Sequence, residues 1–143
     1  MSLMNRMLEA IDTYILRCLP AKIVSRLRVR LWRGMGARVD AHVVIGTGVR
    51  VVGKPGLVLH SGVSIARDAT LDARGGLTLE RSALIGFESV LLTSTHNSGD
   101  IGVPIQTQGM FSRATTVGER AWIGARVIVQ PGVIIGADAI IGS

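Results

Sequence analysis

A chain of 143 residues is long enough for one domain with one hydrophobic core. Apolar residues make up 48% of it but aromatic residues only 3%, so the core must be built from Val, Ile, Leu and Ala. The single cysteine, Cys18, excludes an intrachain disulfide, and no apolar run reaches the ~18–20 residues that a membrane span requires. The N-terminus also lacks the pattern of a secretory signal, so we expect a cytoplasmic protein.

The net charge of +6 is confined to the first part of the chain. Residues 1–38 contain eight basic residues but only Glu9 and Asp12 as acids, whereas residues 39–143 contain eight of each sign. We therefore treat residues 1–37 as a separate basic arm.

The arm is predicted to be helical. Four apolar residues recur at three- and four-residue spacing, which places them on one helix face: Leu8, Ile11, Ile15 and Leu19. Pro20 is expected to end or kink this helix. A second helical segment is expected from Ile23 to Trp32, before Gly34-Met35-Gly36.

Two interpretations of the arm remain open. It can be a cap on the first edge of the following fold, with its basic residues in solvent. Alternatively, it can be a basic amphipathic helix at an anionic membrane surface. Nucleic-acid binding is disfavoured, because no nucleic-acid-binding motif appears among the arginines.

From Val39 onward the sequence has a period of six residues. Fourteen positions in this register are all Val, Ile or Leu: 39, 45, 51, 59, 65, 71, 79, 85, 91, 117, 123, 129, 135 and 141. Small residues recur four positions later, and glycine often follows directly. Short strands joined by tight corners explain this pattern. Three hexads then form one triangular coil, and the coils stack on one another.

The repeat is interrupted at three places. Two extra residues are expected near Lys54-Pro55-Gly56, and two more near Gly75-Gly76. A longer insertion of about 18 residues separates Leu91 from Val117, and its polar, glycine-rich part covers residues 97–116. We expect it to leave the stack as a loop.

The hexads resemble those of the hexapeptide-repeat acyltransferases. The stretch from Val117 to Ala125, VGERAWIGA, is similar to the family signature IGxxxWIGxxxxI, and QPGV follows at 130–133. The segments LDARGG at 71–76 and TSTHN at 93–97 are similar to the maltose, galactoside and exopolysaccharide O-acetyltransferase branch.

The resemblance covers about residues 38–143 and implies an all-β fold, a left-handed parallel β-helix. It implies acetyl-CoA as co-substrate, a sugar or polysaccharide hydroxyl as acceptor, and a homotrimer with active sites between neighbouring subunits. Family members continue with a further coil and a Thr-Lys-Asp-(Val/Ile)-Pro-Pro segment, so the sequence is expected to stop short of the closing coil. The alternative function is a non-catalytic β-helix scaffold.

The resemblance assigns the general base to His96. An imidazole suits this role, because its ordinary pKa of about 6.5 lets it accept a proton from an alcohol near neutral pH. His96 also lies where the chain leaves the coil for the inserted loop. A backbone carbonyl, Asn97 or Glu88 could orient the ring. Family members usually have Asp where this chain has Asn97.

The remaining site residues also come from the resemblance. Trp122 is expected near the thioester end of coenzyme A, with a subunit seam as the alternative. The backbone of four residues is expected to line the pantetheine groove: Gly124, Ala125, Gly142 and Ser143. Asp72 and Asn97 are assigned to acceptor binding, although Asp72 could instead cap a turn. Arg113 and Arg126 could meet coenzyme A phosphates, and a solvated position is the alternative.

No metal site is expected. The competing function of this fold is a metal-dependent carbonic anhydrase, which requires a three-histidine zinc site. His42 and His60 fall at different hexad positions and are not five residues apart.

Overall fold

The computed structural model describes residues 3–15 and 21–143. Helix α1 (Leu3–Ala10) continues into a π-helical segment, η1 (Ile11–Ile15), and helix α2 (Ala21–Gly34) follows. The predicted helix-face residue Leu19, the predicted stop at Pro20, and Cys18 lie outside the described residues. Among residues 3–15 and 21–143, no helix has the length and apolar character of a membrane span.

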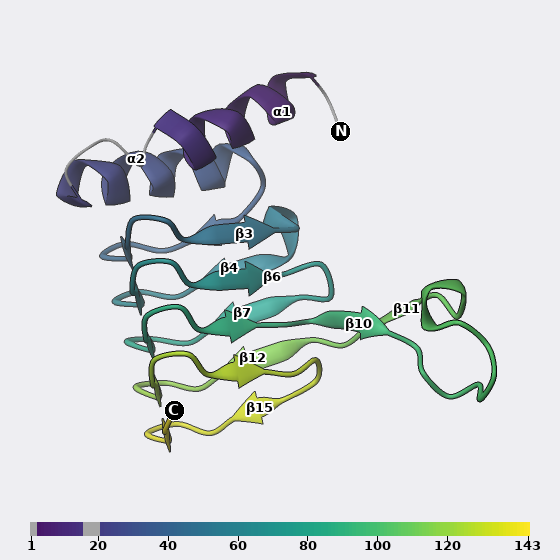
Figure 1. Ribbon diagram of the computed structural model, residues 1–143. Helices are drawn as coiled ribbons and strands as arrows, with labels where there is room; N and C mark the ends of the chain where they lie inside the picture. The colour runs from purple at the N-terminus through teal and green to yellow at the C-terminus, as the bar shows by residue number, and fades with distance from the viewer. Residues whose placement is uncertain (1–2, 16–20) are drawn as a thin grey trace.

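Beneath the helices the chain winds into stacked coils (Figure 1). Each full coil contributes one short strand to each of three parallel sheets. Sheet A contains β1 (Arg38–Val39), β4 (Leu57–Leu59), β7 (Leu77–Leu79), β12 (Thr115–Val117) and β15 (Ile134–Ile135). Sheet B contains β2 (Val44–Ile45), β5 (Ser64–Ile65), β8 (Leu84–Ile85), β13 (Trp122–Ile123) and β16 (Ile140–Ile141). Sheet C contains β3 (Arg50–Val52), β6 (Thr70–Asp72), β9 (Val90–Leu91) and β14 (Ile128–Val129).

The predicted six-residue register is confirmed strand by strand. Val39 pairs with Leu59, Leu59 with Leu79, and Leu79 with Val117 in sheet A, and the corresponding residues stack in the other two sheets. Thirteen of the fourteen predicted positions are buried, and Ile141 in the last coil is partly buried against them. The aliphatic side chains therefore fill one continuous core inside the coils, in agreement with the low aromatic content of the sequence.

The corners between strands bring backbones very close together. A Cβ added at Gly86 would lie 2.4 Å from the carbonyl oxygen of Gly124 in the next coil, which explains glycine at this corner. The extra residues at Lys54–Gly56 form a short 3₁₀ turn, η3, between β3 and β4. The insertion therefore widens a corner and leaves the ladder intact.

Helix α2 caps the first coil. The backbone N–H of Ile45 donates a hydrogen bond to the Ser25 hydroxyl at 2.9 Å, Arg28 donates to the Gly46 carbonyl, and Trp32 belongs to the core cluster. The expectation that the basic residues of a cap lie in solvent is wrong for Arg28. Its guanidinium is buried because Asp12 supplies a carboxylate 2.8 Å away inside the cap.

The long insertion forms a projecting hairpin arm, residues 94–112. Strands β10 (Ser94–His96) and β11 (Met110–Ser112) pair antiparallel, and a 3₁₀ turn, η4 (Ile105–Thr107), lies near the tip. Figure 1 shows the arm extending away from the coils. The predicted loop, 97–116, begins and ends later than the arm, because Thr115 and Thr116 already pair with β7 in the resumed stack.

Candidate functional site

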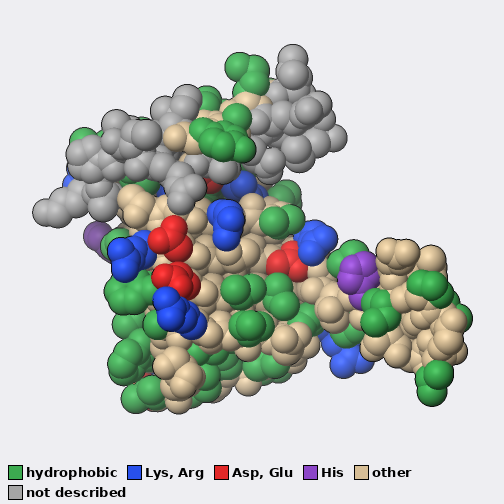
Figure 2. All heavy atoms as spheres, viewed as in Figure 1, with side chains coloured by type: hydrophobic (Ala, Val, Ile, Leu, Met, Phe, Trp, Pro, Cys, Tyr) green, Lys and Arg blue, Asp and Glu red, His purple; other side chains and the backbone are tan. Residues whose placement is uncertain are grey.

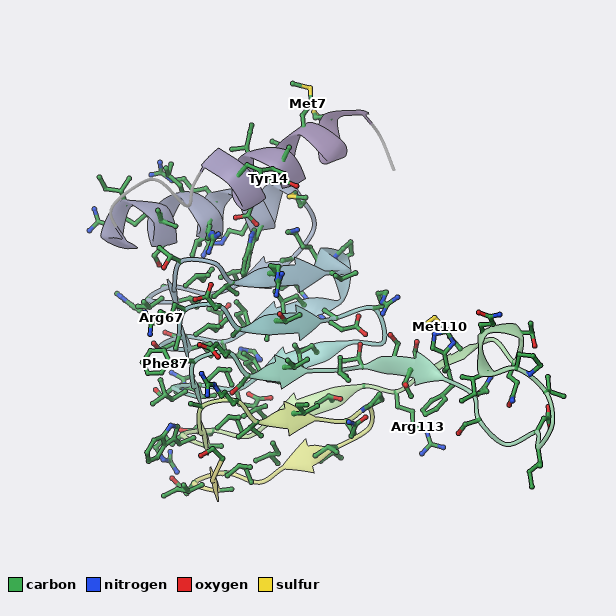
Figure 3. All side chains as sticks on the ribbon, viewed as in Figure 1. Met7, Tyr14, Arg67, Phe87, Met110 and Arg113 are labelled. Carbon is green, nitrogen blue, oxygen red and sulfur yellow. The ribbon has the colours of Figure 1, made fainter. Side chains whose placement is uncertain are left out.

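His96 is the last residue of β10 and lies in the arm rather than in the coils. It is paired in register with Met110 of β11, and its side chain is exposed. Figure 3 labels Met110 on the arm, well away from the sheets. An imidazole held on a paired strand and open to solvent can meet a substrate that approaches from outside the chain.

The base of the arm is fixed by Asp72 at the end of β6. Asp72 accepts hydrogen bonds from the Ser94 hydroxyl, from the Arg74 backbone N–H at 3.1 Å and from Arg74 Nε at 2.8 Å. Burial by itself raises the pKa of the Asp72 carboxyl, but these hydrogen bonds and the Arg74 charge outweigh it and lower the pKa to about 2. Asp72 therefore caps its own turn and anchors Ser94, two residues before His96.

Asn97 closes the loop of the arm. Its amide donates to the Gln108 carbonyl at 3.0 Å, and its backbone N–H donates to the Gly109 carbonyl at 3.1 Å. The Gln108 side chain in turn bonds Asp100 and Val103. The hexapeptide-repeat acyltransferases usually have Asp at the position of Asn97. In this chain the Asn97 amide is hydrogen-bonded within the arm.

Glu88, the other suggested partner of His96, lies elsewhere. It sits at the corner between β8 and β9, where its carboxylate accepts a hydrogen bond from Arg126 at 2.9 Å. Arg126, a candidate contact for coenzyme A phosphates, is therefore paired with Glu88 in this structure. Arg113 lies at the foot of the arm, 5.8 Å from the centre of the Phe111 ring (Figure 3). In the part of the chain that the structure describes, no hydrogen bond or ion pair orients the His96 ring.

Trp122 projects outward from β13 and is 48% exposed. Its ladder neighbours on the outer face of sheet B are Leu84 and Ile140, both exposed. The four other residues assigned to cofactor binding follow at the corner beside it: Gly124 and Ala125 after β13, and Gly142 and Ser143 after β16. The backbones pack closely at this corner, since a Cβ built on Gly124 would lie 2.9 Å from the Ile141 carbonyl oxygen.

His96 and Trp122 lie at different corners of the same chain. The arm leaves the stack after sheet C, at the corner that leads into sheet A, whereas the Trp122 group lies where sheet B leads into sheet C. Figure 1 shows the arm directed away from the coils on one side. Within one chain, the residues assigned to coenzyme A therefore lie together but not beside His96.

One cluster was not found from the sequence. Asp40, His60 and Glu80 stack at one corner, with His60 Nδ1 3.1 Å from Asp40 and Nε2 3.7 Å from Glu80. Their spacing of 20 residues, the coil length, was a signal that could have revealed it. In the described part of the chain, no group of three or more His, Cys, Asp or Glu side chains is arranged to hold a metal ion.

Comparison with known proteins identifies the repeat. The family model described as bacterial transferase hexapeptide (six repeats) matches residues 114–143, which include β12 to β16 and the Trp122 corner. Residues 114–143 are therefore similar to the repeats of the hexapeptide transferases. This assignment agrees with the stacked hexads seen along the whole coil region.

Two curated proteins are similar to most of the chain. A protein of Escherichia coli K12 named as a colanic acid biosynthesis acetyltransferase, WcaF, is 27% identical over 122 residues, 85% of this chain. A Mycobacterium tuberculosis protein named as an acetyltransferase, Rv3034c, is 27% identical over 131 residues. The chain spans less than two thirds of these relatives, 64% of the first and 44% of the second.

Two solved structures share the fold. A galactoside acetyltransferase in complex with coenzyme A superposes with a TM-score of 0.77 at 22% identity, over 99% of this chain and 67% of the other. A Vibrio cholerae hexapeptide-repeat acetyltransferase complexed with acetyl-CoA also gives 0.77, at 16% identity, over 96% and 72%. The fold is the left-handed parallel β-helix of these neighbours.

Proposed function

We propose that the protein is an acetyl-CoA-dependent O-acetyltransferase that modifies a sugar or polysaccharide hydroxyl, with His96 as general base. The observation that carries the proposal is the hairpin arm, which holds an exposed imidazole on a paired strand anchored by Asp72. The names of the relatives support the reaction class and the carbohydrate acceptor. The coenzyme A and acetyl-CoA complexes of the two structural neighbours support the co-substrate.

The residues fit a direct transfer. A neutral His96 accepts the proton of the acceptor hydroxyl as its oxygen attacks the thioester carbonyl, and backbone N–H groups stabilise the negative charge on that carbonyl oxygen. The new C–O bond forms, the C–S bond breaks, and the proton passes to the departing thiolate. Trp122 and the backbone at Gly124, Ala125, Gly142 and Ser143 form the surface on which the pantetheine chain lies.

The complete site requires a second subunit. Because His96 and Trp122 lie at different corners of one chain, the arm of one protomer must reach the Trp122 corner of a neighbour. A homotrimer has three interfaces between neighbouring protomers and would form one such shared site at each. The exposed apolar ladder beside Trp122, which includes Leu84 and Ile140, supports such a seam.

The enzyme is proposed to work in the cytoplasm, at the membrane surface. Met4, Met7 and Tyr14 are exposed on the helical cap, and Figure 2 shows hydrophobic side chains on its outside. Exposed apolar side chains on a helical segment with a net positive charge suit the interface of an anionic bilayer. Replacing Met4 and Met7 with Glu should reduce flotation with anionic vesicles, and undiminished flotation would reject this contact.

The test of acetyl transfer uses acetyl-CoA and a panel of sugar hydroxyl acceptors. His96→Ala should lower acceptor-dependent turnover by about 10²–10⁴-fold, whereas the control variant His60→Ala should keep it. Circular dichroism and the thermal midpoint establish that both variants are folded. Equal turnover by His96→Ala and the parent protein would remove the base role. If the folded parent turned over no acceptor and bound no acetyl-CoA, the alternative of a non-catalytic scaffold would hold.

A further inference from the structure

A cavity of about 710 Å³ lies between helix α2 and the first coil. Helix α2 contributes Ser25, Arg26, Val29, Arg30 and Arg33 to its wall, and residues 40–46 at the corner between β1 and β2 form the other side. This volume is within the range of small-molecule sites, roughly 300–1,000 Å³. The cavity is at the opposite end of the stack from the Trp122 corner.

Positive charge dominates this cavity. Arg26, Arg30 and Arg33 follow at four- and three-residue spacing, so they share one face of α2. Asp40 is the acidic residue among the wall residues, and its carboxylate lies 3.1 Å from His60 of the next coil. The described structure shows no hydrogen bond or ion pair from Arg26 or Arg30 to any of its residues.

The wall is held rigidly. Arg33 is fixed by hydrogen bonds from Nε to the Val39 carbonyl at 2.7 Å and from Nη2 to the Asp40 carbonyl at 3.0 Å. Ser25 and Arg28 attach the same helix to Ile45 and Gly46. The helix that carries the three arginines is therefore fixed to the first coil before a ligand binds, which lowers the entropic cost of binding.

We propose that this cavity binds a phosphate or diphosphate group of a larger ligand. Guanidinium groups pair with phosphate oxygens through parallel, charge-assisted hydrogen bonds, and Arg26 and Arg30 are available to make them. The cavity is larger than a bare phosphate, so it also accommodates the group that the phosphate carries.

The phosphate can belong to a free metabolite or to a lipid. Arg30 also lines a second cavity of about 420 Å³, whose other walls are Leu8, Ile11, Leu27, Leu31 and Gly34. An apolar groove that shares an arginine with the basic cavity suits a phosphate attached to an acyl or isoprenoid chain. The proposal does not depend on acetyl transfer, because none of these residues belongs to the site around His96 or Trp122.

The test measures binding of inorganic pyrophosphate by isothermal titration calorimetry. The double variant R26Q/R30Q should raise the dissociation constant by about tenfold or more, a loss of about 1.4 kcal/mol per factor of ten. The control variant Arg50→Gln removes an exposed arginine from the outer face of sheet C in the same coil and should bind as the parent does. Arg33 is left intact because it attaches α2 to the first coil.

A second arm separates the two sources. Phosphatidylcholine vesicles with and without phosphatidic acid are floated with the parent protein, R26Q/R30Q and Arg50→Gln. Pyrophosphate binding that only R26Q/R30Q loses supports a soluble ligand. Flotation that depends on phosphatidic acid and is lost only in R26Q/R30Q supports a lipid phosphate. The proposal is overturned if neither probe binds the parent, or if R26Q/R30Q binds as the controls do.

Discussion

The hydroxyl of Ser94 donates a hydrogen bond to the carboxylate of Asp72, and this bond joins the first residue of the hairpin arm to the preceding coil. Arg74 donates hydrogen bonds to both oxygens of the same carboxylate. Asp72 is 4% exposed, so its charge is held by these two partners rather than by water. The position of the arm therefore depends on an ionised aspartate.

The first prediction concerns the acid stability of this group. The pKa of Asp72 falls from 3.8 to about 2 on folding, so its stabilisation is fully present above pH 3.8 and is lost as the pH falls towards 2. This linkage amounts to about 2 kcal/mol of unfolding free energy. Urea unfolding of the parent and of Asp72→Asn between pH 5 and pH 2 measures it. The parent should lose more stability than the variant in this window, and parallel curves would contradict the linkage.

The second prediction concerns the buried ion pair of the cap. Arg28 Nε lies 2.8 Å from Asp12 Oδ1, and the two side chains are 1% and 6% exposed. Asp12→Asn leaves the Arg28 charge buried without a counter-charge, which typically costs about 3–5 kcal/mol. A lowered midpoint of urea unfolding checks this. Asp138→Asn, which breaks the exposed pair with Arg120, is the control and should leave the midpoint unchanged.

The third prediction concerns close packing at the corners. Gly86→Ala places a methyl group against the Gly124 backbone, and overpacking of this kind typically costs about 1–3 kcal/mol. Gly136→Ala is the matched control, because no atom lies within 4 Å of the Cβ built there. Thermal unfolding of both variants should show a loss of stability for Gly86→Ala alone. Equal unfolding midpoints for the two variants would mean that the coils accommodate the Gly86→Ala methyl group without loss of stability.

The fourth prediction concerns assembly. Leu84 projects outward from β8 beside Trp122, so Leu84→Asp should dissociate the proposed trimer without disturbing the inward-facing Ile85. Sedimentation velocity of the parent should give the mass of three chains, and the variant should give a smaller species with unchanged circular dichroism. Thr78→Asp, on the outer face of β7 in the same coil, is the control. A parent that sediments as one chain would reject the shared site.

The coil region could be predicted closely from the sequence, because each inward residue is specified by a repeat that the stack itself imposes. Val39, Leu59 and Leu79 show this most clearly, since their spacing of 20 residues already contains the widened corner. The outward residues obey no such constraint, so the Asp40, His60 and Glu80 stack was missed. The burial of Arg28 was also missed, because it depends on Asp12 in a separate helical segment.

The candidate site could be located only in part. The position of His96 at the exit from the coil follows from the broken register between Leu91 and Val117. The hydrogen bonds of Asp72 and Asn97 could not be predicted in the same way. They join these side chains to Arg74, Ser94 and Gln108 through turns, whose geometry the six-residue period does not specify. The assigned roles of His96, Trp122 and the cofactor corner stay predictions.

The hairpin arm also has a consequence for how the chain folds. Pairing of Leu59 with Leu79 closes a segment of 20 residues, whereas pairing of Leu79 with Val117 closes one of 38. Each doubling of a closed segment costs about 0.6 kcal/mol of chain entropy, a penalty no other coil in the stack carries. Addition of the fourth coil to the first three should therefore be about threefold less favourable, in chain entropy alone, than addition of the coils before it.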